Sequence, residues 1–202
     1  MPSEYSAASL WQPHASLVAL GEKRVETRGR YTSYRGPLTI HATKKWDGEI
    51  NQIPFTEPFQ SVLAKHGYWT RWISKHSSHN SVGTNMPLGA VLCIVNLVDC
   101  VPMQKRESAL ARPSYRQFLA DHHPVFIEPR NGHANQYQQM LTPQELAFGL
   151  YEPGRYALIL EMIEVFEKPI PASGKQMFGW KWTRPDDSAI VVPEAEEGFV
   201  LK

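Results

Sequence analysis

Cysteine is scarce in this chain: among 202 residues there are only two, Cys93 and Cys100. So low a count excludes the class of small secreted folds that disulfides hold together. The two lie seven residues apart in one apolar stretch. An odd spacing on a strand would place them on opposite faces, where they cannot easily bridge. We therefore expect two buried, reduced thiols, as in proteins of the cytoplasm.

Long apolar runs are also missing. A membrane-spanning helix needs about 18 or more consecutive apolar residues, and the sequence contains no such run. The N-terminal stretch MPSEYSAASL lacks the basic start and apolar centre of a secretory signal. These two absences predict a cytoplasmic protein with no membrane partner.

The chain has little net charge, +1 at pH 7, so charge alone favours no class of partner. Its distribution is more informative. The segment from Arg184 onward holds five acidic and two basic residues, which leaves 19 Lys and Arg against 15 Asp and Glu in the rest of the chain. Much of this excess lies within residues 23–45. A local basic cleft of this kind is what an anionic backbone requires.

The apolar and turn patterns predict an α+β fold around one central strand. Residues 90–98 are almost continuously apolar and rich in valine, which is typical of a strand buried on both faces, and Pro102 marks its expected end. Pro13 suits the first position of a helix that Gly21 ends. The other expected elements are strands at 7–10, 24–28, 38–42 and 156–167, a helix at 57–66 capped by Thr56 and stopped by Gly67, and a polar loop at 77–85.

Two segments differ from this pattern, and we predict a single domain over residues 1–202 that contains both. Residues 103–150 are less periodic and are interpreted as a partly helical insertion, with short helices at 113–120 and after the capping box that starts at Thr142. The acidic C-terminal tail, 184–202, is either a lid over the basic cleft or a solvated segment. We prefer the solvated tail, because exposed ion pairs contribute little.

Two stretches carry a recognisable pattern: WQPHASLVALGEKRVETR (11–28) and RGPLTIHA (35–42). Together they resemble the ASCH domain (activating-signal-cointegrator homology), a branch of the PUA-like superfamily. The family pattern is a Gln-Pro-Trp-Ala-like helix start, then Gly-x-Lys-x-Val-Glu-x-Arg, then Arg-Gly-x-Leu-x-Ile-His-Ala, and here His14 replaces the aromatic residue. Residues 88–100 and 153–182 also look like the family. The resemblance implies a PUA-like mixed β-barrel with peripheral helices and a cleft beside the helix that follows Trp11.

Charged residues alternate along the strand expected at 24–28. Arg24, Glu26 and Arg28 project to one face, so one carboxylate lies between two guanidinium groups, with Lys23 at the start of the strand. From the pattern alone this is a surface ion-pair ladder, worth about 0–1 kcal/mol. The family resemblance implies instead that these positions line the ligand cleft.

Aromatic and basic residues interleave on either side of that strand. Trp11 is either a core residue or a stacking platform, on which each base contributes about 1–3 kcal/mol. The basic and aromatic loop 29–36 is either an ordinary hairpin loop or a surface for unpaired nucleotides, whose faces stack and whose phosphates need neutralising. The predicted nucleic-acid contacts are Trp11, Lys23, Glu26, Arg28, Arg30, Tyr31, Tyr34, Arg35 and Lys44.

Metal and cofactor signals are weak. The pairs His76 with His79 and His122 with His123 have no cysteine or acidic companion at ligand spacing. No Ser-His-Asp arrangement and no glycine-rich phosphate loop can be assembled. We therefore expect no metal and no cofactor. We interpret His41, on the polar side of its strand, as a hydrogen-bonded structural residue.

These observations support two hypotheses. The first is a module that binds RNA, or single-stranded nucleic acid, through the basic cleft. The second is an enzyme, because some ASCH relatives look like amidohydrolases that act on acetylcytidine, a modified nucleoside, and others like ribonucleases. In the amidohydrolase pattern a threonine lies three residues after the lysine, whereas here Glu26 follows Lys23 at that spacing and Thr27 is one residue off. The pattern also needs a later glutamate, for which Asp99 is the nearest acid. If the chain is an enzyme, Lys23 and Glu26 are the predicted catalytic residues.

Overall fold

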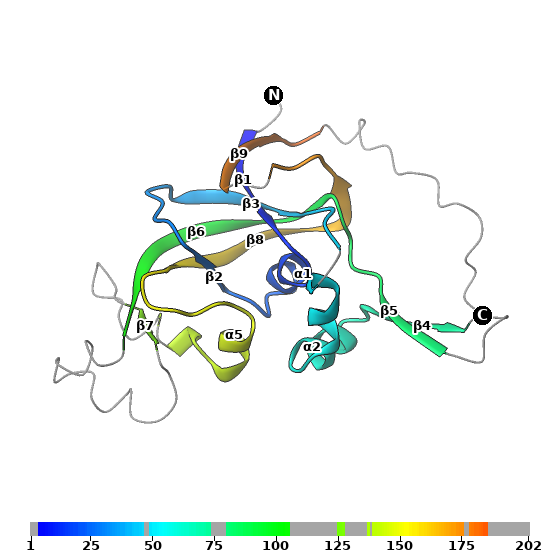
Figure 1. Cartoon of the computed structure of the whole chain (residues 1–202). Coiled ribbons are helices and arrows are strands. Elements are labelled where there is room, and N and C mark those ends of the chain that lie inside the picture. The colour runs from blue at the N-terminus through cyan, green and yellow to red at the C-terminus, as the bar shows by residue number, and fades with distance from the viewer. Residues whose placement is uncertain are drawn as a thin grey trace.

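The computed structural model describes residues 4–46, 49–73, 80–105, 125–127, 137, 139–175 and 178–185. Most of them form one curved sheet with the helices gathered on one side of it (Figure 1). The elements in chain order are β1 (Glu4–Leu10), α1 (His14–Ala19), β2 (Val25–Arg28), β3 (Gly36–Ala42), the 3₁₀ helix η1 (Ile50–Phe55), α2 (Phe59–Lys65), β4 (Trp69–Ile73), β5 (Asn80–Thr84), β6 (Ala90–Lys105), β7 (Val125–Ile127), α5 (Pro143–Ala147), β8 (Tyr156–Pro171) and β9 (Phe178–Thr183).

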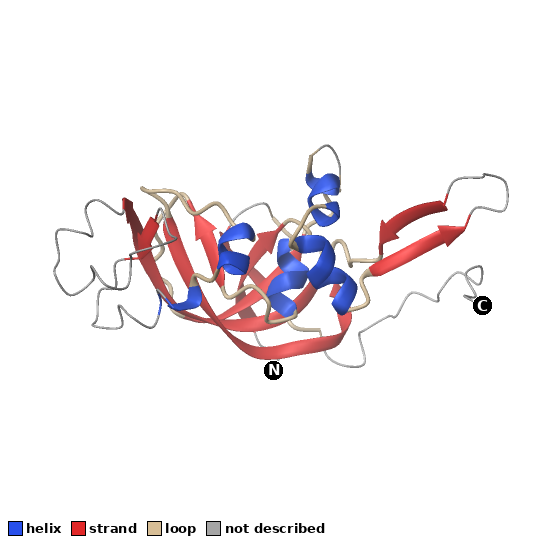
Figure 2. Ribbon diagram, turned by 90° about the horizontal axis from the view of Figure 1, so that it is seen from below, coloured by secondary structure: helices blue, strands red, loops and turns tan. Residues whose placement is uncertain are grey.

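The main sheet is mixed, with strand order β2-β8-β6-β3-β1-β9, and β7 pairs with the end of β6. Neighbouring strands are antiparallel except β1 and β3, which run parallel and pair Ser6 with Leu38 and Leu10 with Ala42. The sheet bends into a half-barrel (Figure 2), which agrees with the predicted α+β class. Off the main sheet, β4 and β5 form an antiparallel hairpin.

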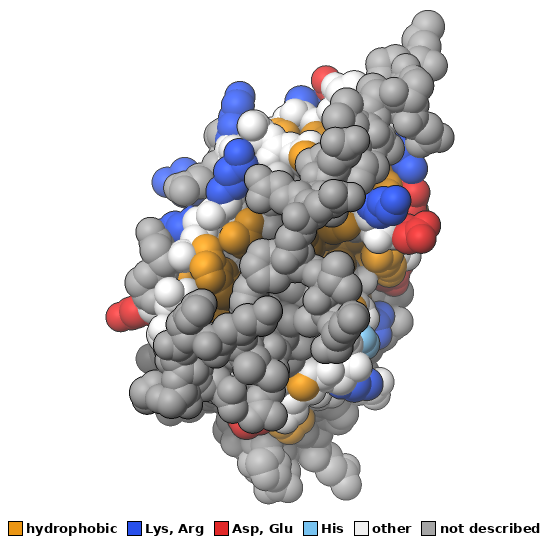
Figure 3. Space-filling model, turned by 90° about the vertical axis from the view of Figure 1, so that its right-hand side faces the viewer, with side chains coloured by type: hydrophobic (Ala, Val, Ile, Leu, Met, Phe, Trp, Pro, Cys, Tyr) orange, Lys and Arg blue, Asp and Glu red, His pale blue; other side chains and the backbone are white. Residues whose placement is uncertain are grey.

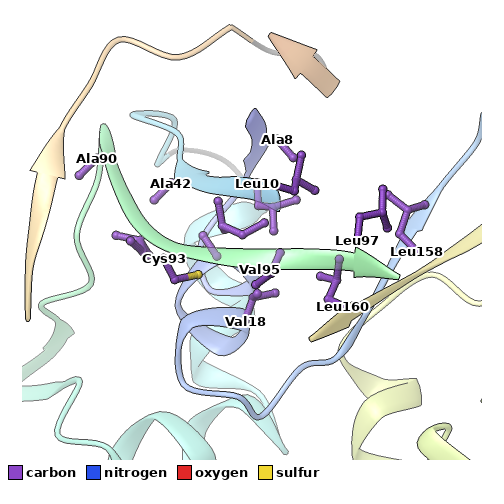
Figure 4. Close-up of a cluster of buried hydrophobic side chains, with 14 of the residues drawn as sticks. Ala8, Leu10, Val18, Ala42, Ala90, Cys93, Val95, Leu97, Leu158 and Leu160 are labelled. Atoms are coloured by element: carbon purple, nitrogen blue, oxygen red, sulfur yellow. The ribbon is translucent and has the colours of Figure 1, made fainter. Parts of the chain in front are cut away.

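The largest hydrophobic cluster lies between this sheet and α1. Leu10 of β1, Val95 of β6 and Leu160 of β8 are all buried in it, and Val18 of α1 packs among them (Figure 4). Fully burying an aliphatic side chain of this size contributes about 1.5–3 kcal/mol. The apolar residues of α1 therefore fix this short helix on the sheet.

A second cluster fixes the surroundings of α1. Leu17 packs with Phe59 and Leu63 of α2 and with Phe148, which follows α5. The rings of Phe59 and Phe148 lie 5.0 Å apart, centre to centre. This packing holds the chain just after α5 close to the start of α1, although the two are far apart in sequence.

The predicted helix is α1, which begins one residue later than expected. Pro13 is its N-cap instead of its first helical residue, and the Gln12 side chain accepts a hydrogen bond from the Ser16 amide at 3.0 Å. The side-chain cap thus comes from the residue before the proline. Gly21, with φ of +73°, ends the helix as predicted, because glycine adopts this conformation without strain.

Three boundaries differ from the prediction. β6 does not end at Pro102, because its ladder resumes at once, where Met103 N donates to Arg155 O at 2.9 Å. Residues 80–84, predicted as a loop, form β5, since polar residues pair through their backbone when a partner strand lies alongside. Thr56 follows η1 and does not cap α2.

Two predictions concern residues that the structure does not describe. The helix at 113–120 and the tail from residue 186 onward lie outside the described residues, so the insertion stays a prediction.

Within the described part, no helix is both long and apolar enough to cross a membrane. Cys93 and Cys100 are buried and neither is in a disulfide, as expected. They belong to one cluster and not to opposite faces, because register shifts interrupt β6 between them.

Candidate nucleic-acid site

A cavity of about 360 Å³ opens between the ends of β1 and β3, the strand β2 and the segment 148–155. The parallel pair creates one side, because Leu10 and Ala42 lie opposite each other and Thr43 N donates to Leu10 O at 2.9 Å. The pairing of β2 with β8 creates the other, because it brings the start of β8 next to Arg28. The lining residues are Ser9, Leu10, Trp11, His14, Glu26, Thr27, Arg28, Thr43, Phe148, Gly149, Leu150 and Arg155.

One carboxylate and two guanidinium groups give this cavity its charge. On β2, Glu26 and Arg28 are partly exposed and alternate with buried residues, as the predicted strand requires. Arg28 Nε lies 3.1 Å from Glu26 Oε1, and Arg28 Nη2 donates to Ser9 O at 3.1 Å. Arg155 Nη2 donates to Thr27 O at 3.3 Å. The second guanidinium beside the carboxylate in the cavity is thus that of Arg155, not that of Arg24 as the strand pattern indicated.

The wall of the cavity carries polar atoms that lack partners. Six buried side-chain nitrogen or oxygen atoms in the described part of the chain have no hydrogen-bond partner, and four of them belong to residues that line this cavity. Buried polar groups in proteins are nearly always hydrogen-bonded, so each exception needs an explanation. A polar ligand bound in the cavity would explain these atoms, because it could hydrogen-bond with them. The four atoms are His14 Nδ1, Thr43 Oγ1, Arg155 Nε and Arg28 Nε. Arg28 Nε has the Glu26 carboxylate 3.1 Å away as an ion-pair partner, so the first three are the atoms that lack a partner.

His14 is a neutral side chain at physiological pH. Burial, and then the positive charge of Lys23, lower the pKa of His14 from 6.5 to about 4, against smaller opposing effects of Glu26 and the Phe148 backbone. Its ring meets the Phe59 ring edge-on, with centres 5.7 Å apart. A neutral imidazole offers one donor and one acceptor, so His14 can recognise polar groups without adding charge to the cavity.

Lys23 lies behind the cavity, with only 2% of its surface exposed. Its Nζ donates to Val25 O and lies 3.7 Å from Glu145 Oε1 and 3.9 Å from Glu26 Oε2. The Glu145 carboxylate also accepts from Arg24 N at 2.8 Å and from Val25 N at 3.2 Å. This buried ion pair holds the start of β2 in place, and Lys23 is not among the residues that line the cavity.

Glu145 reaches β2 from α5. The predicted capping box is confirmed in one half, because Thr142 Oγ1 accepts from Glu145 N at 3.1 Å. The carboxylate makes no return bond to the N-cap amide and turns instead to β2. Tyr151 Oη lies 2.8 Å from Glu145 Oε1, and burial, together with the negative charge of Glu145, raises the pKa of Tyr151. Lys23, Glu145 and Tyr151 therefore form a buried cluster that joins α5 to β2.

Trp11 lies at the mouth of the cavity, with 46% of its surface exposed. Lys45 Nζ lies 5.2 Å from the centre of its ring, at cation–π distance. Lys44, its neighbour in sequence, lines a different cavity. On the face of the molecule shown in Figure 3, the lysine and arginine side chains of the described residues lie in separate groups.

The predicted residues of the loop between β2 and β3 lie apart from the cavity lining. Arg35 Nη2 donates to Asp99 Oδ1 at 2.7 Å, and Arg35 Nη1 donates to Tyr34 O at 2.8 Å. The Arg35 guanidinium is 6.0 Å from the centre of the Tyr31 ring, and Arg30 is exposed. Asp99, the acid considered for the amidohydrolase pattern, is thus engaged by Arg35, whereas the acids near Lys23 are Glu26 and Glu145.

Sequence reasoning does not identify His14, Thr43, Arg155 or Glu145 as parts of the site. Arg155 contacts a residue that is 128 positions away in the chain, and only strand pairing brings the two together. The turn that precedes β8 marks where Arg155 lies but not what it faces. His14 had a signal, because it is the position at which the chain departs from the ASCH pattern.

The fold is a half-open mixed barrel with a polar cavity beside its first helix. The family model of the ASCH domain matches residues 9–169, most of the chain, so the chain belongs to the ASCH-domain family. ASCH domains are generally associated with RNA binding. A search of the curated proteins found no match to the chain.

Proposed function

We propose that the chain binds RNA and that the cavity beside Trp11 accepts one unpaired base. The observation that carries the proposal is the set of three buried polar atoms without partners, His14 Nδ1, Thr43 Oγ1 and Arg155 Nε, on residues that line a cavity with an exposed tryptophan at its mouth. A volume of about 360 Å³ lies within the usual range for small-ligand sites, roughly 300–1,000 Å³. We further propose that the half-barrel is a PUA-like barrel and that residues 1–202 form one domain with an insertion at 103–150.

The proposed contacts divide by chemistry. Trp11 stacks on a base. Glu26 accepts a hydrogen bond from an exocyclic amino group, as carboxylates do with cytosine. Arg28 and Arg155 donate to base carbonyl or phosphate oxygens. Only an unpaired nucleotide can present these edges and faces together, which favours single-stranded or looped RNA over a duplex.

The remaining predicted residues are proposed to act around the cavity. Arg30, Tyr31 and Tyr34 would contact the flanking strand, and Tyr31 has 41% of its surface exposed. Arg35 would contribute less than Arg28, because its guanidinium is already paired with a carboxylate. Lys23 would act through Glu26, whose carboxylate it approaches from behind. Lys44 is proposed to contact the RNA backbone that flanks the bound nucleotide.

Binding of a single-stranded RNA oligonucleotide, followed by fluorescence anisotropy over a range of salt concentrations, tests this function. Trp11→Ala should weaken binding about 5- to 150-fold without changing the salt dependence, because stacking releases no counterions. Arg28→Gln and Arg155→Gln should each weaken binding and flatten the slope by about 0.7. Lys181→Gln is the matched control, since Lys181 is exposed and pairs with Glu4 at the far edge of the sheet. Wild-type affinity in all three cavity variants would refute the proposal.

Lys23→Ala is not a clean test of RNA binding. Removing the ammonium leaves the Glu145 carboxylate buried without its charge partner, and such a loss typically costs about 3–5 kcal/mol of stability. Weak binding by this variant would therefore report unfolding as readily as a lost contact. The partly exposed arginines of the cavity carry the test instead.

The buried cluster favours hydrolysis of a modified nucleoside as a second candidate function. Buried lysines can serve as general bases and nucleophiles, and Glu26 connects Lys23 to the cavity. For acetylcytidine, water would add to the acetyl carbonyl, the carbon–nitrogen bond would break, and acetate and the free amine would leave. Glu26 would hold the amide and move the proton, at the position where the family pattern has threonine.

Incubation with acetylcytidine, with chromatographic detection of cytidine, tests this second function. Glu26→Gln keeps the shape of the side chain and should lower the rate about 10²–10⁴-fold, the usual contribution of a general acid or base. Incubation with RNA in the presence of a chelator tests ribonuclease activity in the same way. If wild-type protein produces neither cytidine nor RNA fragments, the enzymatic function is excluded and RNA binding is unaffected.

A further inference from the structure

A second cavity, of about 320 Å³, lies between the end of β3 and the segment that follows β8. Lysines converge on it from both sides: Lys44 and Lys45 after β3, and Lys175 after β8. Hydroxyl groups of Thr43 and Ser173 are among its lining. None of the eight described residues that line it is acidic: His41, Thr43, Lys44, Lys45, Ala172, Ser173, Gly174 and Lys175.

The wall of this second cavity is pre-formed, because His41 anchors the segment after β8. Ala172 N donates to Gly89 O at 2.9 Å, and His41 Nε2 lies 3.2 Å from Ala172 O. The other ring nitrogen of His41 lies 3.0 Å from Ser9 Oγ, so the interpretation of this histidine as a hydrogen-bonded structural residue is confirmed. Gly174 rests on the same ring, where a Cβ atom would come within 2.3 Å of His41 Cε1.

The interior of this cavity is electropositive. Burial lowers the pKa of His41 and the positive charge of Lys44 adds to the effect, against a hydrogen bond to Ala172 that raises it. The ring is therefore held neutral beside the positive charge of Lys44. An anion in the cavity would meet positive charge on two sides and no competing carboxylate from the lining residues.

The second cavity adjoins the proposed base cavity, because the two share a lining residue. Thr43 lines both, and its buried Oγ1 has no hydrogen-bond partner. Lys45 lines the second cavity and places its Nζ 5.2 Å from the centre of the Trp11 ring, which lines the first. One ligand can therefore contact both cavities, with an aromatic group in the first and an anionic group in the second.

We propose that the second cavity is a phosphate subsite, which holds a backbone phosphate of the RNA whose unpaired base enters the first cavity. The inference rests on the proposed RNA-binding function for the source of the phosphate, and on Lys44, Lys45, Lys175 and the Thr43 hydroxyl for the chemistry. Ammonium groups and a hydroxyl donate hydrogen bonds to phosphate oxygens without reading sequence. The second cavity thus adds a phosphate contact beside the cavity that accepts the base.

Titration with inorganic phosphate, followed by the amide signals in two-dimensional NMR spectra, tests the subsite without RNA. Phosphate should shift the amides of Ser173, Gly174 and Lys175 in the wild-type protein. Lys175→Gln should weaken this response, because it removes one of the converging charges, while Lys181→Gln should leave it unchanged. An identical response in wild type and Lys175→Gln would overturn the assignment.

Salt-dependent binding of single-stranded RNA tests whether the phosphate belongs to a nucleic acid. Lys175→Gln should flatten the salt slope by about 0.7, and Lys181→Gln should keep the wild-type slope. If the wild-type protein binds phosphate at Ser173–Lys175 but no RNA, the RNA-binding function fails and the subsite holds a free phosphate ligand. If it binds RNA, yet phosphate moves none of these amides and Lys175→Gln keeps the wild-type slope, the subsite fails and RNA binding stands.

Discussion

His14 makes the stability of the protein depend on pH. Its pKa is lowered to about 4 in the folded protein, mainly by burial, so below pH 6.5 the unfolded chain binds a proton that the folded protein does not. We expect the free energy of unfolding to fall by up to about 3 kcal/mol between pH 6.5 and pH 4 from this group. Above pH 6.5 its contribution is complete. Urea unfolding at a series of pH values measures the effect.

The variant His14→Gln isolates this contribution. Between pH 5 and pH 6.5 it should lose less stability than the wild type, although His41, whose pKa is also lowered, contributes equally to both proteins. Glu22 titrates at lower pH, because hydrogen bonds from His66 and Lys65 lower its pKa to about 2. Parallel stability curves for the two proteins would contradict the assignment to His14.

Gly174 is needed because of its close contact with His41. A methyl group at this position would lie 2.3 Å from ring atoms that are held on both sides by hydrogen bonds. We expect Gly174→Ala to lower the free energy of unfolding by about 1–3 kcal/mol, the usual cost of overpacking. Gly29→Ala is the control, since nothing lies within 4 Å of that added methyl. Equal denaturation midpoints would show that the segment does not rest on His41.

Among the elements, α5 and β2 depend on each other through Glu145. Its carboxylate accepts two backbone amides at the start of β2 and is the buried partner of Lys23. We expect Glu145→Ala to lower the free energy of unfolding by about 3–5 kcal/mol, because it removes the nearer and more deeply buried of the two carboxylates that compensate the Lys23 ammonium. Chemical denaturation measures this, and the exposed Glu152 provides the control variant Glu152→Ala.

Tyr151→Phe distinguishes a cluster from a simple ion pair. The phenol lies within hydrogen-bond distance of Glu145 Oε1 and of Val25 O. Its removal should cost about 0.5–1.5 kcal/mol, the net contribution of one hydrogen bond. If Glu145→Ala were as mild as this variant, the ion pair would not determine how β2 begins.

The elements that the sequence predicts well are those with local signals. Gly21 ends α1, and apolar alternation identifies β3 and β8, because period and turn chemistry depend on neighbours in the chain. The capping box that starts at Thr142 is an equally local signal, and its hydrogen bond from the Glu145 amide to the Thr142 hydroxyl is present. The carboxylate of that box is not predictable in this way, since its partners are backbone amides 120 and 121 positions away.

The residues of the candidate site also divide into those that a local sequence signal predicts and those that only long-range contacts bring in. Trp11, Glu26 and Arg28 are found from one continuous motif, whereas Arg155 arrives through the pairing of β2 with β8. The strand pattern predicts that Lys23 lies close to Glu26. It does not predict that Lys23 is buried, because its other carboxylate partner, Glu145, comes from α5. Residues of the loop between β2 and β3 looked equivalent to these in the sequence, and the structure places them outside the cavity.

At the scale of the whole molecule, the described sheet is complete before the acidic tail begins. β9 ends at Thr183, and Arg184 then pairs with Glu164 through two nitrogens at 2.9 Å. We expect truncation after Pro185 to leave the free energy of unfolding almost unchanged. Truncation after Gly179 should destabilise the protein strongly, because it removes the buried Trp180 and Trp182. Thermal unfolding of the two shortened chains gives the comparison.

The same truncation after Pro185 tests the predicted role of the tail, whose residues from 186 onward lie outside the described part of the chain. We expect RNA affinity at low salt to stay unchanged, since exposed acids contribute little to distant sites and are screened within about 8–10 Å. A gain in affinity that fades as salt rises would show that the tail competes with RNA for the basic cleft.

The pairing of β2 with β8 also determines when during synthesis the protein acquires its cavity. Residues 25–28 find their strand partners only at residues 156–159, and β1 finds its outer partner only in β9. At roughly 5–20 residues per second, a ribosome takes on the order of ten seconds to make the intervening chain. During that interval the nascent chain exposes Trp11 and its basic segment with half of the cavity wall still unmade. The newborn protein therefore becomes competent for its ligand only late in translation, after β8 has emerged.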